Sequence, residues 1–238
     1  MIITIDGPAG SGKSTAARQL SQALGAAYLD TGAMYRAVTL AALEAGADLA
    51  DEAALAQLAR RLDLRLSYRG GQTVVKLGGR DVTGLIRAAR VTDNAHFVAR
   101  AVGVRGVLVE VQRRIGRELE AATGGVVSEG RDQGSVVFPD ADLKFYLDAA
   151  PEVRARRRYD EMLAGGQEAD YEHVLQAIVT RDGRDRSRPY GPLVKPTGAI
   201  EIDTSDKDIP QVTAELLRHV RAARAGPPAP GADAGGRR

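Results

Sequence analysis

Short apolar runs alternate with helical patterns along most of the chain. The runs that read as strands end at polar residues or glycine, and they cover residues 2–6, 126–130, 143–148 and 199–203. Between them, apolar residues recur at helical spacing, as they do from residue 16 to residue 24. Strands that alternate with helices are typical of a parallel sheet covered by helices. The pattern therefore predicts an α/β fold, a three-layer sandwich around a parallel core sheet.

Two segments interrupt this alternation. Residues 64–83 alternate between polar and apolar positions and contain glycine pairs at 70–71 and 78–79. This pattern predicts a small antiparallel hairpin or a three-stranded unit. Residues 151–171 are rich first in arginine and then in glycine, glutamate and aspartate, and we expect them to form a second insertion.

The C-terminal part contains one more helical pattern and a segment of different composition. Apolar residues recur on one face of a helix expected over residues 209–224. Residues 225–238 are rich in glycine, proline and alanine and lack the apolar side chains of a packed element. We therefore expect this segment to be a disordered tail.

Charge and composition exclude several classes of protein. The 33 basic and 31 acidic residues give a net charge of +2, which offers little support for a nucleic-acid or membrane partner, and we expect neither. Cysteine is absent, which excludes disulfides, thiol catalysis and cysteine-ligated zinc. Asp6 interrupts the first apolar run, and no segment reaches the length of a membrane span, so we expect a cytoplasmic protein.

The stretch GPAGSGKS (7–14) lies where the first predicted strand passes into the first predicted helix. It matches the phosphate-loop (P-loop) pattern of glycine, four residues, and Gly-Lys-Ser/Thr. Small residues let backbone N–H groups form an anion cradle, and the helix adds the positive end of its dipole. Lys13 can reach the β- and γ-phosphates of a nucleotide, and Ser14 can offer its hydroxyl to Mg²⁺. A glycine-rich turn without a function is the alternative, but the flanking strand and helix favour ATP or GTP binding.

The distribution of arginine favours a kinase over other P-loop proteins. The chain has no Asn/Thr-Lys-x-Asp guanine reader, and residues 130–134 lack the switch spacing of a GTPase. Phosphoryl transfer between two anions needs fixed positive charge, and the arginine fork suits phosphate oxygens. Arginines occur in clusters at 35–36, 130–132, 154–158 and 181–188. Each cluster alone could be a solvated helix face or a network of surface ion pairs, but together they favour a small anionic acceptor.

Five segments together resemble bacterial cytidylate kinases. They are GPAGSGKST (7–15), LDTGAMYRA (29–37), EGRDQGSVVFPDAD (129–142), RDGRDRSRPYGPL (181–193) and IDTS (202–205), in the order of the family. The resemblance implies phosphoryl transfer from ATP to CMP or dCMP with Mg²⁺, by a monomer. It also implies a core, a monophosphate-binding domain enlarged by a small antiparallel β insertion, and a helical lid, all within residues 1–224. The corresponding division is core 1–30, 101–150 and 172–224, insertion 31–100, and lid 151–171.

The resemblance also implies roles for individual residues. The expected ATP-binding residues are Gly7, Pro8, Ala9, Gly10, Ser11, Gly12, Lys13, Ser14 and Thr15. The expected CMP-binding residues are Thr31, Tyr35, Arg36, His96, Arg105, Arg131, Asp132, Arg181, Asp185 and Arg188. The expected catalytic residues are Lys13, Arg131 and the lid arginines Arg154, Arg157 and Arg158. Ser14 and Glu129 are expected to hold Mg²⁺, mostly through water.

Some positions depart from the family pattern. Thr31 and His96 stand where serine is expected near the base, and Gln133 replaces an apolar residue. These departures concern the choice of base, since every expected phosphate-binding arginine is present. His96 is alternatively a structural residue, and Asp30 a helix cap. One alternative is a P-loop kinase for another acceptor, such as UMP, AMP, shikimate or dephospho-coenzyme A. Another is a non-catalytic ATP-sensing module. A screen of acceptors distinguishes the kinases from one another, and the sensing module would show no acceptor-dependent turnover.

Overall fold

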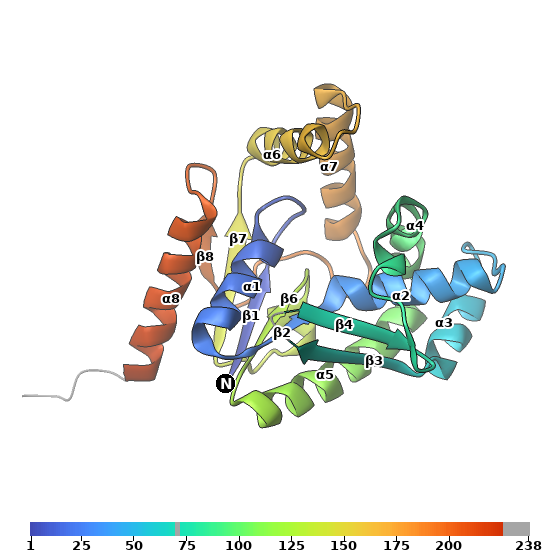
Figure 1. Ribbon diagram of the computed structural model, residues 1–238, viewed down its shortest axis with the longest axis horizontal. Coiled ribbons are helices and arrows are strands. Elements are labelled where there is room, and N and C mark those ends of the chain that lie inside the picture. Colours follow the sequence, from blue (N-terminus) through green and yellow to red (C-terminus); the bar gives the residue numbers. More distant parts are fainter. Residues whose placement is uncertain (70–71, 226–238) are drawn as a thin grey trace, which may run out of the picture.

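A five-stranded parallel sheet forms the centre of the computed structural model, which describes residues 1–69 and 72–225 (Figure 1). Its strand order is β2-β6-β1-β7-β8, so the first strand lies in the middle. The strands are β1 (Ile2–Asp6), β2 (Ala27–Asp30), β6 (Val126–Glu129), β7 (Leu143–Asp148) and β8 (Ile200–Asp203). From β1 the chain crosses to β2 at one edge of the sheet, returns with β6 beside β1, and then continues on the other side of β1 with β7 and β8. Such a reversal of strand order creates a crevice at the carboxyl ends of the strands.

An acidic residue ends every strand of this sheet. The five residues are Asp6, Asp30, Glu129, Asp148 and Asp203. Because parallel strands have their carboxyl ends at the same edge, all five carboxyl groups belong to one edge of the sheet. This edge is therefore suited to hold basic side chains and the ends of loops.

Helices cover both faces of the sheet and confirm the predicted three-layer sandwich. One face packs against α1 (Lys13–Leu24) and α8 (Ile209–Ala225), whose buried residues share a core with Ile5 and Phe145. The other face packs against α2 (Thr31–Glu44) and α5 (Val102–Thr123), and α3 (Glu52–Arg61) and α4 (Ala89–Arg100) pack on these two helices. A short 3₁₀ helix, η1 (Leu85–Arg87), precedes α4, and a π-helical turn, η2 (Gln133–Val137), follows β6.

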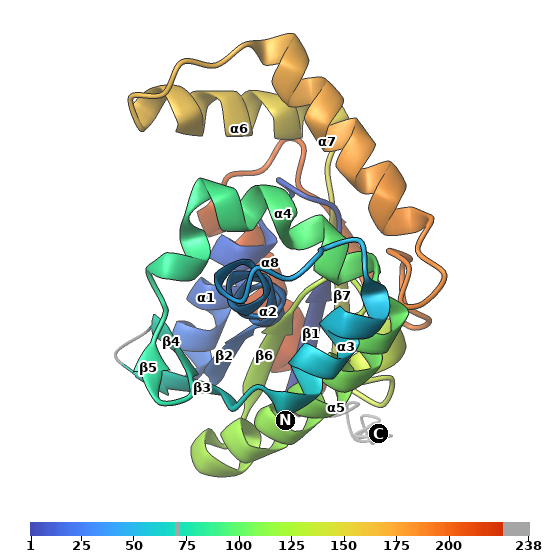
Figure 2. The ribbon, with the colours of Figure 1, turned by 90° about the vertical axis from the view of Figure 1, so that its right-hand side faces the viewer.

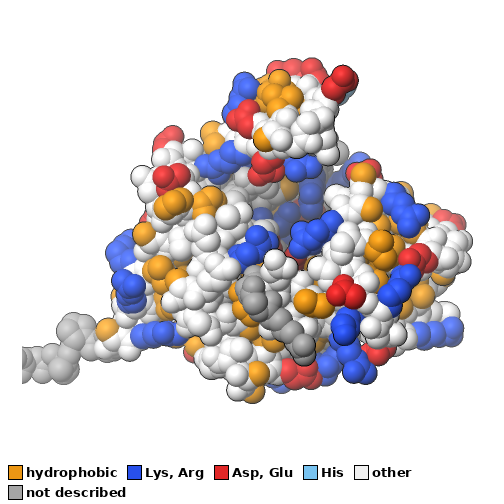
Figure 3. Space-filling view, viewed as in Figure 1, with side chains coloured by type: hydrophobic (Ala, Val, Ile, Leu, Met, Phe, Trp, Pro, Cys, Tyr) orange, Lys and Arg blue, Asp and Glu red, His pale blue; other side chains and the backbone are white. Residues whose placement is uncertain are grey.

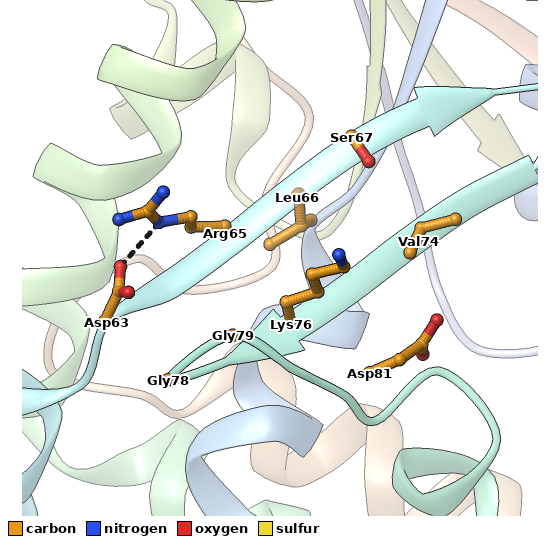
Figure 4. A pocket seen from close by; sticks show the side chains of 9 residues that line it. All are labelled: Asp63, Arg65, Leu66, Ser67, Val74, Lys76, Gly78, Gly79 and Asp81. Carbon is orange, nitrogen blue, oxygen red and sulfur yellow. Dashed lines mark hydrogen bonds and ion pairs between the residues drawn. The ribbon is translucent and has the colours of Figure 1, made fainter.

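The interrupting segment at 64–83 forms a second, antiparallel sheet, as predicted. Its strands are β3 (Leu64–Arg69), β4 (Gln72–Leu77) and β5 (Arg80–Asp81), in the order β3-β4-β5. The glycine pair at 70–71 lies outside the described residues. A shallow hollow over this sheet is lined by residues such as Arg65, Lys76 and Asp81 (Figure 4), and no P-loop residue lines it.

The helices α6 (Pro151–Ala164) and α7 (Tyr171–Arg186) form an arm that stands over the carboxyl edge of the sheet (Figures 1 and 2). They pack together through a small core of their own, made by Ala155, Val174 and Ile178. We call these two helices and the residues between them the arm. The arm contains the segment 151–171, which we expected to form a helical lid, and its helix α7 continues beyond this segment to Arg186.

The structure adds one strand that the apolar pattern did not predict. Strand β2 has only four residues and lies between the C-cap Gly25 and the N-cap Asp30, so it lacks the length that makes a strand visible in a sequence. The closing helix was correctly predicted, and Ala225 is its last residue instead of the first residue of a tail. The rest of the expected tail, 226–238, lies outside the described residues. Among residues 1–69 and 72–225, no helix is sufficiently long and apolar to span a membrane.

Candidate active site

The P-loop connects β1 to α1 and closes tightly against the neighbouring strand. Gly7 has a φ of 147°, and a Cβ at this position would lie 2.0 Å from the carbonyl oxygen of Leu147. Only glycine therefore fits at the start of the loop. Helix α1 begins after Gly12, so its free N–H groups and its positive dipole end face the loop. The predicted strand, loop and helix are all present in the order that a P-loop requires.

Lys13 and Ser14 meet Glu129 at the end of β6. The ammonium group of Lys13 donates to the carbonyl of Pro8 at 2.6 Å and lies 4.0 Å from Glu129 Oε1. The hydroxyl groups of Ser14 and Tyr28 donate to Glu129 Oε2 at 3.1 Å and 3.3 Å. Burial, together with the positive charge of Arg131, lowers the pKa of Lys13 to about 7. Ser14 and Glu129, the two expected metal residues, are therefore in direct contact.

Asp6 fixes the segment that follows β6. Its two carboxyl oxygens accept hydrogen bonds from the backbone N–H groups of Gln133 at 2.8 Å and Gly134 at 2.7 Å. Burial raises the pKa of Asp6 to about 7, although these two donors act in the opposite direction. The π-helical turn η2 begins at this point, and such turns are frequent at functional sites. Asp6 thereby sets where Arg131 and Asp132 lie.

Asp185 of α7 holds two of the expected phosphate-binding arginines. Its Oδ2 accepts from Arg131 Nε at 2.9 Å, and its Oδ1 accepts from Arg188 Nη2. Burial alone would raise the pKa of Asp185, but Arg131, Arg188 and Arg181 outweigh it and lower the pKa. Arg181 has an exposed side chain, yet the surrounding protein and the charges of Arg131, Arg188 and Arg36 lower its pKa to about 10. Positive charge is thus concentrated here beyond what one carboxylate neutralises.

Arg36 and Thr31 extend this group from the start of α2. Arg36 Nη2 donates to Asp30 Oδ2 at 3.1 Å, and its buried Nε has no partner within the described residues. Asp30 Oδ1 also accepts from the backbone N–H of Ala33 at 2.9 Å, so Asp30 does cap the helix. Thr31 donates to the backbone carbonyl of Glu129 at 2.7 Å. These contacts tie the first turn of α2 to the ends of β2 and β6.

A buried ion pair between Arg105 and Asp132 lies beside Tyr35. Arg105 Nη2 donates to Asp132 Oδ2 at 2.5 Å, and both side chains are almost fully buried. The guanidinium carbon of Arg105 lies 5.4 Å from the centre of the Tyr35 ring. Burial and the charge of Asp132 raise the pKa of Tyr35 to about 12, and its hydroxyl lacks a partner in the described part of the chain. Arg105 therefore contacts both Asp132 and Tyr35, and all three are among the expected CMP-binding residues.

The arginines of the arm have three different environments. Arg154 is buried and donates to the carbonyls of Ala149 at 2.8 Å and Ala9 at 3.0 Å. Arg157 donates to the carbonyl and the hydroxyl of Thr204, next to β8. Arg158 is exposed and lies 3.3 Å from Glu161 one turn away, a surface ion pair of the kind that the sequence also allowed. Of the three expected lid residues, the structure brings only Arg154 into hydrogen-bond contact with the P-loop.

His96 is partly exposed on α4, and its Nδ1 lies 2.7 Å from the carbonyl oxygen of Asp93 in the same helix. If His96 contacts a base, it therefore does so through its other ring nitrogen, Nε2. Arg36 pairs with Asp30, Arg131 and Arg188 pair with Asp185, and Arg181 is close enough to Arg131, Arg188 and Arg36 for their charges to lower its pKa. Figure 3 shows basic side chains that line a cleft between the arm and the body. The structure therefore brings the arginines expected at the phosphate of CMP into one cluster.

Several residues of this cleft were missed by the sequence analysis. They are Asp6, Tyr28 and Asp182, together with the amide of Gln133, which accepts from Ser128 at 2.8 Å and donates to Gln112 at 3.1 Å. A signal was present for two of them. Asp6 ends a predicted strand beside the P-loop, and Asp182 lies three residues before Asp185 on the same helix face. Tyr28 had no signal, because the strand that carries it was not predicted.

Comparisons with known proteins identify the family and the fold of this chain. The family model described as cytidylate kinase matches residues 3–222. The cytidylate kinase of Exiguobacterium sibiricum is 47% identical over 214 residues, which cover 90% of this chain and 94% of that protein. That of Pelotomaculum thermopropionicum is 47% identical over 223 residues, with 93% and 96% covered. A crystal structure of an uncharacterized protein from Eubacterium ventriosum shares the fold, with a TM-score of 0.50 at 12% identity over 93% of this chain and 99% of that one. Because the family model spans nearly the whole chain and relatives with 47% identity cover at least 90% of it, this chain belongs to the cytidylate kinase family.

Proposed function

We propose that this protein transfers the γ-phosphoryl group of ATP to CMP or dCMP, giving ADP and CDP or dCDP. The observation that carries the proposal is the proximity of two anion-binding features. Lys13 of the P-loop is close enough to Arg131 and Arg181 for their charges to lower its pKa, and Asp185 holds both Arg131 and Arg188. Two neighbouring phosphate-binding sites are what a transfer between two nucleotides requires.

The proposed roles come from the family relationship, and the contacts of the side chains support them. Residues 7–15 bind the phosphates of ATP, and Lys13 supplies charge to the transferred group. Arg36, Arg131, Arg181 and Arg188 bind the phosphate and sugar of CMP, while Arg105, Asp132, Tyr35, Thr31 and His96 form the base side. A phosphate oxygen of CMP attacks the γ-phosphorus directly, so no side chain is needed as a nucleophile. Catalysis then comes from alignment and from charge that is fixed before the reaction.

The residues near Lys13 also fit a magnesium ion. Ser14 Oγ and Glu129 Oε2 lie 3.1 Å apart, and hydroxyl and carboxylate oxygens are the ligands that Mg²⁺ prefers. No group of three histidine or acidic side chains that could hold a metal occurs in the described residues, so the proposed site relies on water and nucleotide phosphates for its other ligands. When bound, Mg²⁺ neutralises charge on the phosphates of ATP.

We also propose the arrangement that the family relationship implies. The protein acts as a cytoplasmic monomer, with a core at 1–30, 101–150 and 172–224. The monophosphate-binding insertion is 31–100, and the lid is 151–171. Light scattering of the purified protein, with and without nucleotides, tests the monomer.

A coupled assay of ADP release tests the proposed reaction, with Mg·ATP and each nucleoside monophosphate in turn. We expect turnover with CMP and dCMP to be much faster than with AMP or GMP. The variant Asp185→Asn should raise the KM for CMP about tenfold or more, because Arg131 and Arg188 lose their common acceptor, while the KM for ATP changes little. Glu172→Gln, at an exposed position of the same helix α7, is the matched control. Absence of turnover with every monophosphate, despite ATP binding, would refute the proposal.

A further inference from the structure

The backbone of Ala9 in the P-loop is held from two sides by the arm. Arg154 of α6 donates to the carbonyl of Ala9 at 3.0 Å, and Asp182 of α7 accepts from its N–H at 3.3 Å. The two side chains also pair with each other, with Arg154 Nη1 2.5 Å from Asp182 Oδ2. Both backbone polar groups of Ala9, which belong to two successive peptide units of the P-loop, are therefore held by an ion pair that joins both helices of the arm.

This ion pair is almost completely shielded from water. The side chains of Arg154 and Asp182 are 2% and 3% exposed. A buried ion pair contributes little net stability, because desolvation offsets its attraction. The loss of one partner, however, leaves a buried charge without compensation. The pair is thus better suited to fixing a geometry than to stabilising the fold.

The P-loop and α6 also approach each other closely beside this pair. Gly10 has a φ of 79°, and a Cβ at this position would lie 3.1 Å from the Cβ of Arg154. On the far side of the loop, Thr204 donates to the carbonyl of Ser11 at 3.3 Å, and Arg157 of α6 donates to the carbonyl of Thr204. Helix α6 therefore controls the loop backbone directly at Ala9 and through Thr204 at Ser11.

We propose that Arg154 and Asp182 form a latch that sets the P-loop in its phosphate-binding shape and links it to the position of the arm. Both are positioning residues that act through Ala9. This differs from the expected role of Arg154 at the transferred phosphoryl group, since its guanidinium donates to Ala149, Ala9 and Asp182. The inference rests on the proposed function only in so far as the P-loop binds a nucleotide.

The latch is tested by ADP binding and by deuterium exchange of the P-loop, measured without CMP. In Asp182→Asn, Arg154 loses its counter-charge although an acceptor for Ala9 remains. We expect ADP affinity to fall about tenfold and the peptide over residues 7–12 to exchange faster in the nucleotide-free protein. The KM for CMP should change less than about threefold. Arg154→Lys keeps the charge but loses the planar fork, so it should shift both readouts in the same direction by less.

The control variant is Ile178→Ala, which weakens the core of the arm one turn before Asp182 without removing a contact to Ala9. It should leave ADP affinity within about twofold. The latch is overturned if Asp182→Asn leaves both ADP affinity and exchange unchanged, or if Ile178→Ala reproduces both effects. If Asp182→Asn does not fold, Arg154→Lys tests the latch by the same two measurements, and unchanged ADP affinity together with unchanged exchange would overturn it. Failure of the wild-type protein to phosphorylate CMP would refute the proposed function but not the latch, because neither readout needs the acceptor.

Discussion

Lys13 Nζ lies 4.0 Å from Glu129 Oε1, and both side chains are almost completely buried. At this distance the two charges attract each other without a direct hydrogen bond, because Lys13 donates to Pro8 and Glu129 Oε2 accepts from Ser14 and Tyr28. Glu129 therefore compensates only part of the cost of burying the ammonium group. The pKa of Lys13, lowered to about 7, follows from that incomplete compensation.

ADP binding should be linked to proton uptake by Lys13. A nucleotide phosphate adds negative charge beside the amine and raises its pKa, so binding at about pH 8 should take up close to one proton. Calorimetric titrations in two buffers of different ionisation enthalpy measure this number. Lys13→Arg, which is always charged, is the control and should take up none. Equal heats in both buffers for the wild-type protein would contradict the lowered pKa.

The variant Lys13→Met should gain stability while it loses activity. A lysine whose pKa falls from 10.5 to about 7 on folding costs stability fully below about pH 7, and this cost disappears as the pH rises towards 10.5. At about 1.4 kcal/mol per pKa unit, the fall in pKa costs about 5 kcal/mol, and after about 1 kcal/mol is subtracted for the lost bond to Pro8 the gain is on the order of 4 kcal/mol at neutral pH. It should shrink in urea unfolding at about pH 10. Lys76→Met, on the exposed face of β4, should show no such pH dependence.

Tyr28→Phe should weaken the response to Mg²⁺ without changing CMP binding. The Tyr28 hydroxyl donates to Glu129 Oε2 at 3.3 Å, so its removal frees the carboxylate that we propose at the metal. Loss of one such bond, about 1 kcal/mol, corresponds to about a fivefold higher Mg²⁺ concentration for half-maximal rate. The matched control is Tyr68→Phe, whose hydroxyl lies 3.4 Å from Ser21. If the Mg²⁺ concentration for half-maximal rate is unchanged in Tyr28→Phe, the proposal that Glu129 helps to hold the metal is wrong.

The P-loop and the α/β architecture could be predicted because their signals are local. Glycines at fixed spacing, a preceding apolar run and a following helical period all lie within residues 2–24. Strand β2 was missed because four buried residues between two helices carry no period. Because this strand was not predicted, Tyr28 was missed as well, although its hydroxyl donates to Glu129.

The contacts of the arm could not be predicted, because they depend on how two helices are placed in space. The sequence of the arginine cluster at 154–158 does not distinguish side chains that face a phosphate from those that face a backbone carbonyl or water. In the structure Arg154 reaches the P-loop, Arg157 reaches Thr204, and Arg158 lies on the surface. Asp182, the partner of Arg154, is 28 positions away in the chain, beyond any local pattern.

His96 should help to select cytosine over uracil through the ring nitrogen that faces away from its own helix. Nδ1 lies 2.7 Å from the carbonyl of Asp93, so Nδ1 carries the proton of the neutral ring and Nε2 is an acceptor. Cytosine offers an amino donor at the position where uracil has a carbonyl acceptor. The proposed contact therefore favours CMP, and UMP would place two acceptors against each other.

The variant His96→Phe keeps a ring of similar size and removes the acceptor. We expect the ratio of kcat/KM for CMP to that for UMP to fall about tenfold, mostly because the rate with CMP declines. His173→Phe removes a histidine whose side chain is 92% exposed on α7, and it should leave the ratio unchanged. If His96→Phe also leaves the ratio unchanged, the hydrogen bond to Asp93 describes the whole role of His96, and selectivity for the base lies with Arg105 and Asp132.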